Sequence, residues 1–158
     1  MPKARSALEE LVENPRQKLD ILTCNAGVMN PPEGKTKDGF ETQVGTNHLA
    51  HYLLFNLLSD ALVAAATPEF PSRVVILASV AHHFGGVDFN DYNFEGNYDK
   101  NLAYATSETA NEIKRRFEDR HVHAWSVQPS AVITNLTRSQ AVPPITSRVK
   151  ELSLFDES

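Results

Sequence analysis

A continuous run of aliphatic residues, Val74 to Ala78, does most to limit what this chain can fold into. An uninterrupted run of this kind is typical of a strand in a parallel sheet covered on both faces, whereas a half-exposed strand alternates apolar and polar residues. Pro68 and Pro71 stand shortly before the run and end whatever helix precedes it. We therefore predict a central strand over residues 73–79.

The apolar pattern elsewhere alternates between strand-like and helix-like segments. Two shorter apolar runs predict further strands, over residues 19–22 and 123–127. Apolar residues at helical spacing predict three helices, over residues 4–12, 39–65 and 102–119. About three strands and three helices in alternation indicate an α/β fold built from βαβ units around a parallel sheet.

Composition excludes several classes of protein. The 158 residues, 41% of them hydrophobic and 22% charged, suit a single globular domain. A net charge of -5 without a basic cluster argues against a nucleic-acid partner. A lone Cys24 forms no internal disulfide, and neither an apolar leader nor a run of membrane-spanning length is present. We expect a cytoplasmic location and no membrane partner.

The segment 102–112 combines polar side chains on one side of a predicted helix. Residues three and four apart are neighbours on a helix, so Tyr104, Ser107, Glu108 and Asn111 share one face. Glu108 lies one turn beyond Tyr104 and must influence the electrostatics of its ring hydroxyl. A tyrosine with an ionisable neighbour is a candidate acid or base.

Several motifs along the chain resemble those of the short-chain dehydrogenase/reductase family, in the form found among its retinol-dehydrogenase-like and fungal members. Tyr104 lies in a stretch that resembles the family's Tyr-x-x-x-Lys helix, with Glu108 at the lysine position. Asn47 matches the asparagine of the family's long fourth helix, and Ser79 matches the serine that ends its fifth strand. The other two motifs are the loop residues Asn25, Ala26 and Gly27, and the segment from Pro129 to Thr134, in which Ser130 replaces a glycine.

The resemblance implies a chemistry. Tyr104 would be the general acid/base at the oxygen of an alcohol or ketone, Ser79 would hold that oxygen, and Asn47 would anchor a relay water. NAD or NADP would lie against Asn25, Ala26, Gly27, Pro129 and Thr134. An ionised Glu108 has the opposite charge to the family's lysine, so it would raise the pKa of Tyr104 and repel a developing oxyanion.

The resemblance also sets the expected organisation. It covers residues 19–136 and implies the central part of a Rossmann-like, doubly wound sheet, incomplete at both ends, over residues 4–136, with an irregular tail over 137–158. The glycine-rich turn Thr-Gly-x-x-x-Gly-x-Gly, which binds the cofactor pyrophosphate, does not occur in the sequence. Gly85 and Gly86 are predicted to form a flexible loop instead. We therefore expect this chain alone not to bind NAD or NADP specifically.

The six histidines suggest no metal site. His48 and His51 lie on one helix face, but no cysteine pair or glutamate-rich framework accompanies them. The long connection over residues 81–101 is the kind of loop that borders a substrate in an enzyme, so we expect His82 and His83 to line the mouth of the site.

Three functional hypotheses stay open. The first is an oxidoreductase that interconverts alcohols and carbonyls with a nicotinamide cofactor, for example in a fungal secondary-metabolite pathway, and that is weak or inactive as it stands. The second is a non-catalytic module that forms a homo-oligomer or binds a complete family member through the helices over 39–65 and 102–119. The third is a degenerate gene product without a stable fold.

Overall fold

The computed structural model describes residues 9, 12–14, 17–111, 120–129 and 136. Within these residues three parallel strands form one sheet in the order β1-β2-β3. Their bounds are β1 (Ile21–Cys24), β2 (Ser72–Leu77) and β3 (Val122–Val127). The predicted parallel sheet with the Val74 run at its centre is confirmed, although β1 begins at Ile21 rather than Leu19.

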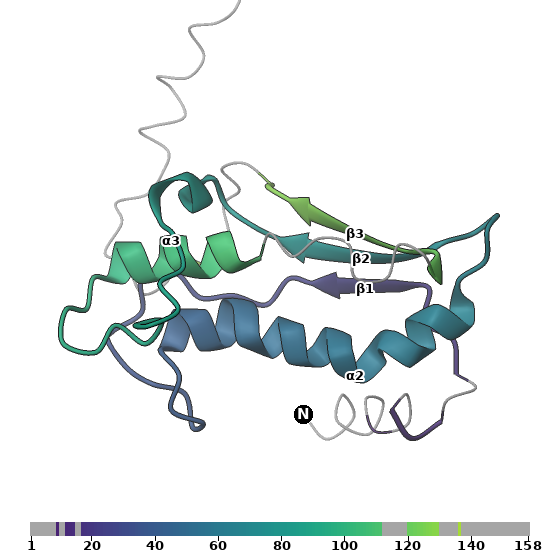
Figure 1. Ribbon diagram of the computed structural model, residues 1–158, viewed down its shortest axis with the longest axis horizontal. Coiled ribbons are helices and arrows are strands. Elements are labelled where there is room, and N and C mark those ends of the chain that lie inside the picture. Colours follow the sequence, from purple (N-terminus) through teal and green to yellow (C-terminus); the bar gives the residue numbers. More distant parts are fainter. Residues whose placement is uncertain (1–8, 10–11, 15–16, 112–119, 130–135, 137–158) are drawn as a thin grey trace, which may run out of the picture.

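One face of the sheet is covered by α2 (Ala50–Ala65), which runs beneath the strands in Figure 1. Leu62 is completely buried at this contact. The strand register places Leu22 opposite Val74, so their side chains share the face that α2 covers. The buried cluster formed there consists of Leu22, Cys24, Leu58, Leu62, Val74 and Val122.

The second face of the sheet carries apolar side chains that stay exposed. Val75 is opposite Trp125, and Leu77 is opposite Val127. Trp125 is 44% exposed, Val127 40% and Ile21 49%. The expectation of a sheet covered on both faces is therefore wrong for the part of the chain that the structure describes, because its long helix α2 lies on one face.

The long helix predicted over residues 39–65 begins later and includes an irregular first segment. Gly39 has a φ of 86°, which an α-helix excludes. The Glu41 carboxylate then accepts hydrogen bonds from the backbone N–H groups of Gln43 and Val44, so helical structure begins there. The first regular segment is a π-helix, η1 (Val44–Leu49), which continues directly into α2.

The third helical region is α3 (Lys100–Ala110), which lies beyond the carboxyl ends of the strands in Figure 1. It begins earlier than predicted because Asp99 accepts hydrogen bonds from the N–H groups of Asn101 and Leu102 at 2.8 and 2.9 Å. A short 3-10 helix, η2 (Val80–Phe84), interrupts the predicted loop over 81–101. Residues 112–119, most of the predicted helix over 4–12 and the tail over 137–158 lie outside the described residues.

The core predicts a clear difference between two leucines of α2. Leu62→Ala removes a fully buried side chain and is expected to lower the free energy of unfolding by about 2–5 kcal/mol. Leu53→Ala, at a position 59% exposed on the same helix, is expected to cost less than about 1 kcal/mol. Urea unfolding followed by Trp125 fluorescence measures both. Equal losses in the two variants would contradict the packing described here.

Candidate active site

The carboxyl ends of all three strands point toward α3 (Figure 1). In open parallel sheets, ligands bind at this edge. The predicted residues Asn25 to Gly27 follow β1, Ser79 follows β2, and Pro129 follows β3. Asn25, Ala26, Gly27 and Pro129 are exposed. Thr134 lies outside the described residues.

Asn47 holds the loop after β1 through its side-chain amide. Its Oδ1 accepts from the Val28 N–H at 2.8 Å, and its Nδ2 donates to the Val28 carbonyl at 3.0 Å. A Cβ added to Gly27 would lie 3.4 Å from Asn47 Oδ1, so the loop passes close to this amide. Asn47 lies within the π-helix η1, and π-helical turns occur frequently at functional sites. The Asn47 side chain is only 3% exposed, so these hydrogen bonds matter for stability, because a buried amide without partners destabilises the folded state.

Ser79 and Tyr104 meet between the end of β2 and α3. The Tyr104 side chain is hydrogen-bonded to Ser79 and is only 8% exposed. Ser79 Oγ also accepts from the Ala81 N–H at 3.2 Å, which caps η2 and fixes the serine. Burial raises the pKa of Tyr104, the Ser79 hydrogen bond lowers it, and the charge of Glu108 raises it.

Ser107 connects Asn47 to the tyrosine helix. The Asn47 Nδ2 donates to Ser107 Oγ at 3.0 Å, and this hydroxyl donates to the Tyr104 carbonyl at 2.8 Å. Ser107 is completely buried. Side chains of η1, α3 and the end of β2 thus form one hydrogen-bonded site, although Asn47, Ser79 and Tyr104 are far apart in the sequence.

Glu108 is buried beside this site, at 5% exposure. Burial raises the pKa of Glu108 to about 7, although the positive charge of His82 acts to lower it. A large share of the molecules therefore carry a neutral Glu108 at neutral pH. The repulsion expected from an ionised glutamate is correspondingly partial and depends on pH.

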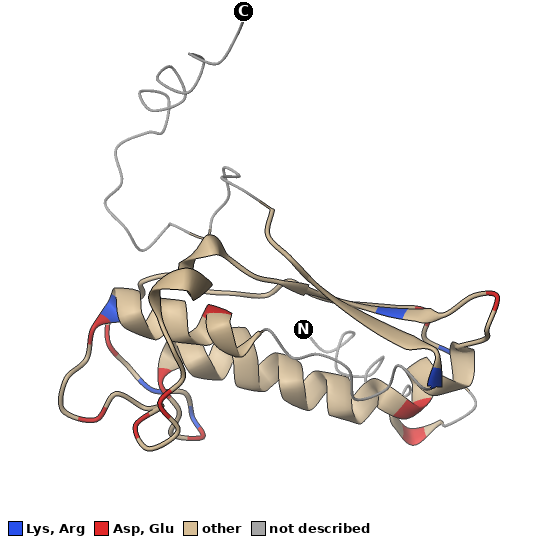
Figure 2. Ribbon diagram, turned by 45° about the horizontal axis from the view of Figure 1, so that its top comes forward, with Lys and Arg blue, Asp and Glu red and all other residues tan. Residues whose placement is uncertain are grey.

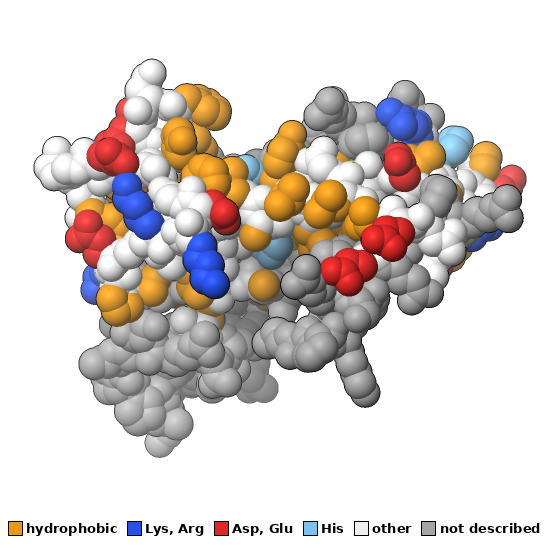
Figure 3. Space-filling model, turned by 90° about the horizontal axis from the view of Figure 1, so that it is seen from below, with side chains coloured by type: hydrophobic (Ala, Val, Ile, Leu, Met, Phe, Trp, Pro, Cys, Tyr) orange, Lys and Arg blue, Asp and Glu red, His pale blue; other side chains and the backbone are white. Residues whose placement is uncertain are grey.

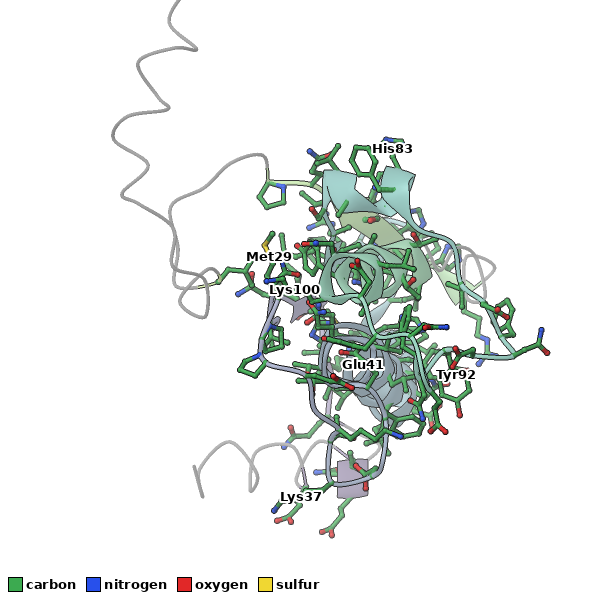
Figure 4. The ribbon with its side chains drawn as sticks, turned by 90° about the vertical axis from the view of Figure 1, so that its left-hand side faces the viewer. Met29, Lys37, Glu41, His83, Tyr92 and Lys100 are labelled. Carbon is green, nitrogen blue, oxygen red and sulfur yellow. The ribbon has the colours of Figure 1, made fainter. Side chains whose placement is uncertain are left out.

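The last turn of α3 lies directly against η2. Thr109 Oγ1 is 3.1 Å from the His82 carbonyl and 2.7 Å from the Gly85 carbonyl, within hydrogen-bond reach of both. A Cβ at Gly85 would lie 2.7 Å from the Cβ of Ala105, so only glycine fits there without a shift. Residues 85–88 form a loop, as predicted, and this loop packs against α3 at Gly85. Figure 4 shows His83 on the outer side of η2.

A second polar network, not anticipated from the sequence, joins the loops to the starts of the helices. The Gln43 side chain accepts from the Asn30 N–H at 2.9 Å and donates to the Lys100 carbonyl at 2.8 Å. Glu41, which accepts from the N–H groups of Gln43 and Val44 at the start of η1, is only 2% exposed. Figure 4 shows it at the same end of the molecule as Lys100, the first residue of α3. The signal in the sequence was the polar trio 41–43 before an apolar helix, which is typical of a helix cap.

The loops at this end are rich in acidic side chains (Figure 2). An exposed ion pair of 2.7 Å between Lys35 and Glu95 joins the connection after β1 to the loop before α3. An exposed pair of this kind contributes little to stability. We therefore expect the buried Gln43 hydrogen bonds to hold this end of the molecule together more strongly than the ion pair does.

Metal ligands and membrane-spanning helices were also sought in the described residues. No group of three or more His, Cys, Asp and Glu side chains there could hold a metal ion. His48 instead contacts Asn111 at 3.3 Å, and burial lowers its pKa while this hydrogen bond opposes the shift. None of the described helices is both long and apolar enough to cross a bilayer.

Known proteins resemble this chain across most of its length, although no family model matches it. The short-chain dehydrogenase/reductase prx1 of Penicillium roqueforti is 40% identical over 143 residues, which are 87% of this chain and 42% of that protein. Retinol dehydrogenase 14 of Homo sapiens is 42% identical over 140 residues, 85% of this chain and 40% of that protein. By sequence, this chain is a relative of the short-chain dehydrogenases/reductases. The chain spans less than half the length of these curated relatives.

Solved structures share the fold. An uncharacterised protein from Mycobacterium paratuberculosis superposes with a TM-score of 0.61 at 34% identity, covering 84% of this chain and 50% of that one. The RhlG/NADP complex of Pseudomonas aeruginosa gives a TM-score of 0.63 over 96% of this chain and 56% of that one. At its 23% identity, this second likeness shows the fold alone. The predicted Rossmann-like fold class is confirmed.

The buried Glu108 predicts a pH-dependent stability. Its pKa is raised from 4.5 to about 7 in the folded protein, so the folded state holds the proton more tightly than the unfolded state does. The contribution of this protonation to the free energy of unfolding is complete below about pH 4.5 and is lost as the pH rises through about 7. Glu108→Gln removes the titration, so its unfolding free energy relative to the natural chain should increase by up to about 3 kcal/mol over this window. Urea unfolding at several pH values measures the difference, and a difference independent of pH would contradict the raised pKa.

Proposed function

We propose that this chain is the central, reaction-bearing part of a short-chain dehydrogenase/reductase that interconverts an alcohol and a ketone or aldehyde with NAD or NADP. The observation that carries the proposal is the convergence of Asn47, Ser79 and Tyr104 in one hydrogen-bonded site at the carboxyl ends of the strands. The names of the relatives from Penicillium roqueforti and Homo sapiens support the same reaction class.

Each side chain has a role that its contacts support. Tyr104 exchanges a proton with the substrate oxygen, and Ser79, already hydrogen-bonded to Tyr104, positions that oxygen. Asn47 keeps the loop after β1 and α3 in a fixed relation through Val28 and Ser107. Burial of the tyrosine excludes water from the proton transfer, but it also opposes formation of the phenolate.

The residues at the strand ends fit a nicotinamide cofactor. Asn25 to Gly27 and Pro129 are exposed at the edge where ligands bind, and Gly27 passes close to Asn47. A bound nicotinamide cofactor would supply hydride donor or acceptor chemistry. The pyrophosphate requires a glycine-rich turn that this sequence does not contain, so strong binding depends on residues outside this chain.

Glu108 makes the tyrosine a weaker acid than a lysine at that position would, and for this reason we propose weak activity for the sequence as it stands. The fungal sources of several relatives support a setting in fungal secondary metabolism. A cytoplasmic location remains our prediction.

An activity measurement tests the proposed function. The glycine-rich segment of a fungal relative is fused ahead of Ala4, and reduction of a generic ketone is followed through NADPH and NADH absorbance. We expect weak turnover that Tyr104→Phe abolishes, while Glu108→Lys increases kcat/KM by about a hundredfold, the lower range for one acid/base element.

Two controls accompany this test. Tyr92→Phe, in the loop before α3, removes a hydroxyl outside the site and should leave turnover unchanged. The chain without the fused segment should show no saturable binding of NADH tighter than about 100 μM. Turnover that persists in Tyr104→Phe, in a fusion that binds the cofactor, would contradict the proposal.

A second candidate function, an interaction module, is favoured by an apolar stripe on the outer side of α2. The stripe consists of Tyr52, Leu53 and Leu57, which are 42%, 59% and 45% exposed. Figure 3 shows apolar side chains gathered on this side of the molecule. Exposed apolar side chains that adjoin on one helix face are typical of protein interfaces. We propose that the stripe binds a second copy of this chain or a complete family member.

Sedimentation of two variants tests this interface. Leu53→Lys combined with Leu57→Lys places two charges on the stripe and should convert an associated species into a monomer. Phe89→Lys, at a position 84% exposed in the loop before α3, is the matched control and should not change the mass. If the natural chain sediments as a monomer up to about 100 μM, self-association with a dissociation constant below that concentration is excluded.

A further inference from the structure

The side-chain amide of Gln43 connects the same two segments as that of Asn47. Gln43 Oε1 accepts from the backbone N–H of Asn30 at 2.9 Å, and Nε2 donates to the Lys100 carbonyl at 2.8 Å. Asn47 likewise accepts from the Val28 N–H through Oδ1 and reaches α3 through Nδ2. In both residues the amide oxygen holds the loop after β1, and the amide nitrogen bonds to α3.

The two amides come from one helical segment and hold α3 on both sides of the tyrosine. Gln43 and Asn47 are four residues apart, at the start of η1 and within it, and side chains at this spacing are neighbours on a helix. On α3, Lys100 is four residues before Tyr104, and Ser107 is three residues after it. The tyrosine therefore lies between two anchored positions of its own helix, one held by each amide.

Burial makes the Gln43 bridge specific. Gln43 is completely buried, so water cannot replace a hydrogen bond that is lost there. A backbone N–H only donates and a carbonyl only accepts, so the two partners determine which way the amide points. The Glu41 carboxylate accepts from the Gln43 N–H at 2.9 Å and holds the backbone from which the side chain extends. A further link between the same segments, from Asn30 Nδ2 to Asn101 Oδ1, is exposed.

We propose that Gln43 is a second positioning residue of the active site, which fixes the separation between the loop after β1 and Tyr104. The proposal rests on the proposed function, in which this loop contacts the nicotinamide cofactor and Tyr104 exchanges a proton with the substrate. Hydride and proton transfer to one substrate need both groups at a set separation, and a misplacement of about 1 Å can cost about a hundredfold in rate. Gln43 belongs to none of the motifs found in the sequence, so this role follows from its contacts alone.

Hydrogen exchange of the full chain tests the bridge without a cofactor. Gln43→Met keeps the length of the side chain and removes both hydrogen bonds. The exchange rate of the Asn30 N–H should rise at least about fivefold, the effect expected of one buried hydrogen bond. The rate of the Tyr104 N–H should rise as well, because an α-helix bonds it to the carbonyl four residues earlier, that of Lys100.

A second variant keeps this test decisive if the methionine variant does not fold. Gln43→Asn retains the amide but is shorter by one methylene, so it cannot reach both Asn30 and Lys100. At least one of the two exchange rates should therefore rise. A role that needed only a buried polar side chain would leave both rates unchanged in this variant.

Two control variants separate the bridge from overall stability. Leu62→Ala weakens the contact between α2 and the sheet, so it should speed exchange of the Val74 N–H in β2. The rates of Asn30 and Tyr104 should stay within about twofold, because a local opening at η1 does not break the Leu62 contact. Asn101→Ala removes the exposed link and should also leave both rates within about twofold.

The fused enzyme of the proposed function supplies a kinetic measurement. Gln43→Met should lower kcat for the ketone by at least about tenfold per folded molecule, because a displaced tyrosine is misaligned in the transition state. The KM for the ketone should change by less than about threefold, since substrate binding does not require that alignment. Asn101→Ala should leave both constants within about twofold.

The outcomes separate this inference from the proposed function. Exchange rates that do not change in the folded Gln43 variants, or that rise equally in Leu62→Ala, overturn the bridge whatever the activity is. Faster exchange together with an unchanged kcat in an active fusion overturns the positioning role. A fusion whose turnover persists in Tyr104→Phe overturns the proposed function instead, while the exchange rates still decide whether Gln43 holds the loop to α3.

Discussion

The side-chain amide of Asn47 is the interaction on which the arrangement of the site depends. It is bonded to both backbone groups of Val28 and to the hydroxyl of Ser107, so one residue joins the loop after β1 to the tyrosine helix. Because the amide is buried, loss of any partner would leave a polar atom without compensation. Asn47 lies in the π-helix η1, which leads directly into α2.

Burial determines the electrostatic character of the site more than the identity of the charged residues does. Glu108 differs in sign from the lysine of the family pattern, yet a buried carboxyl with a pKa of about 7 is neutral in a large share of molecules. The same desolvation raises the pKa of Tyr104, so the tyrosine loses support for its phenolate even where the glutamate is neutral. Both effects raise the pKa of Tyr104, and the part that comes from the charge of Glu108 varies with pH.

Only one of the two faces of the sheet is covered by a long helix among the described residues. α2 buries one face through Leu62 and Val74, while Trp125 and Val127 stay exposed on the other. The curated relatives extend well beyond the segment that matches this chain, and doubly wound folds carry helices on both faces of the sheet. In a doubly wound fold a helix would cover this second face, which agrees with the apolar character of Trp125 and Val127.

The sequence by itself determined the order of the three strands and of the two long helices between them, and it placed the Val74 run at the centre of the sheet. The reason is that a long aliphatic run is stable only where neighbouring strands flank it. It also indicated Tyr104, Ser79 and Asn47 through their resemblance to family motifs. Only the tertiary structure decided that Ser107 links Asn47 to the tyrosine helix and that Ser79 meets Tyr104. It also decided that Gly85 packs closely on Ala105, and that Glu41 and Gln43 join the loops to the helix starts. The physical reason is that hydrogen bonding, close approach and desolvation act between residues distant in sequence, so the raised pKa of Glu108 follows chiefly from its burial in the folded chain.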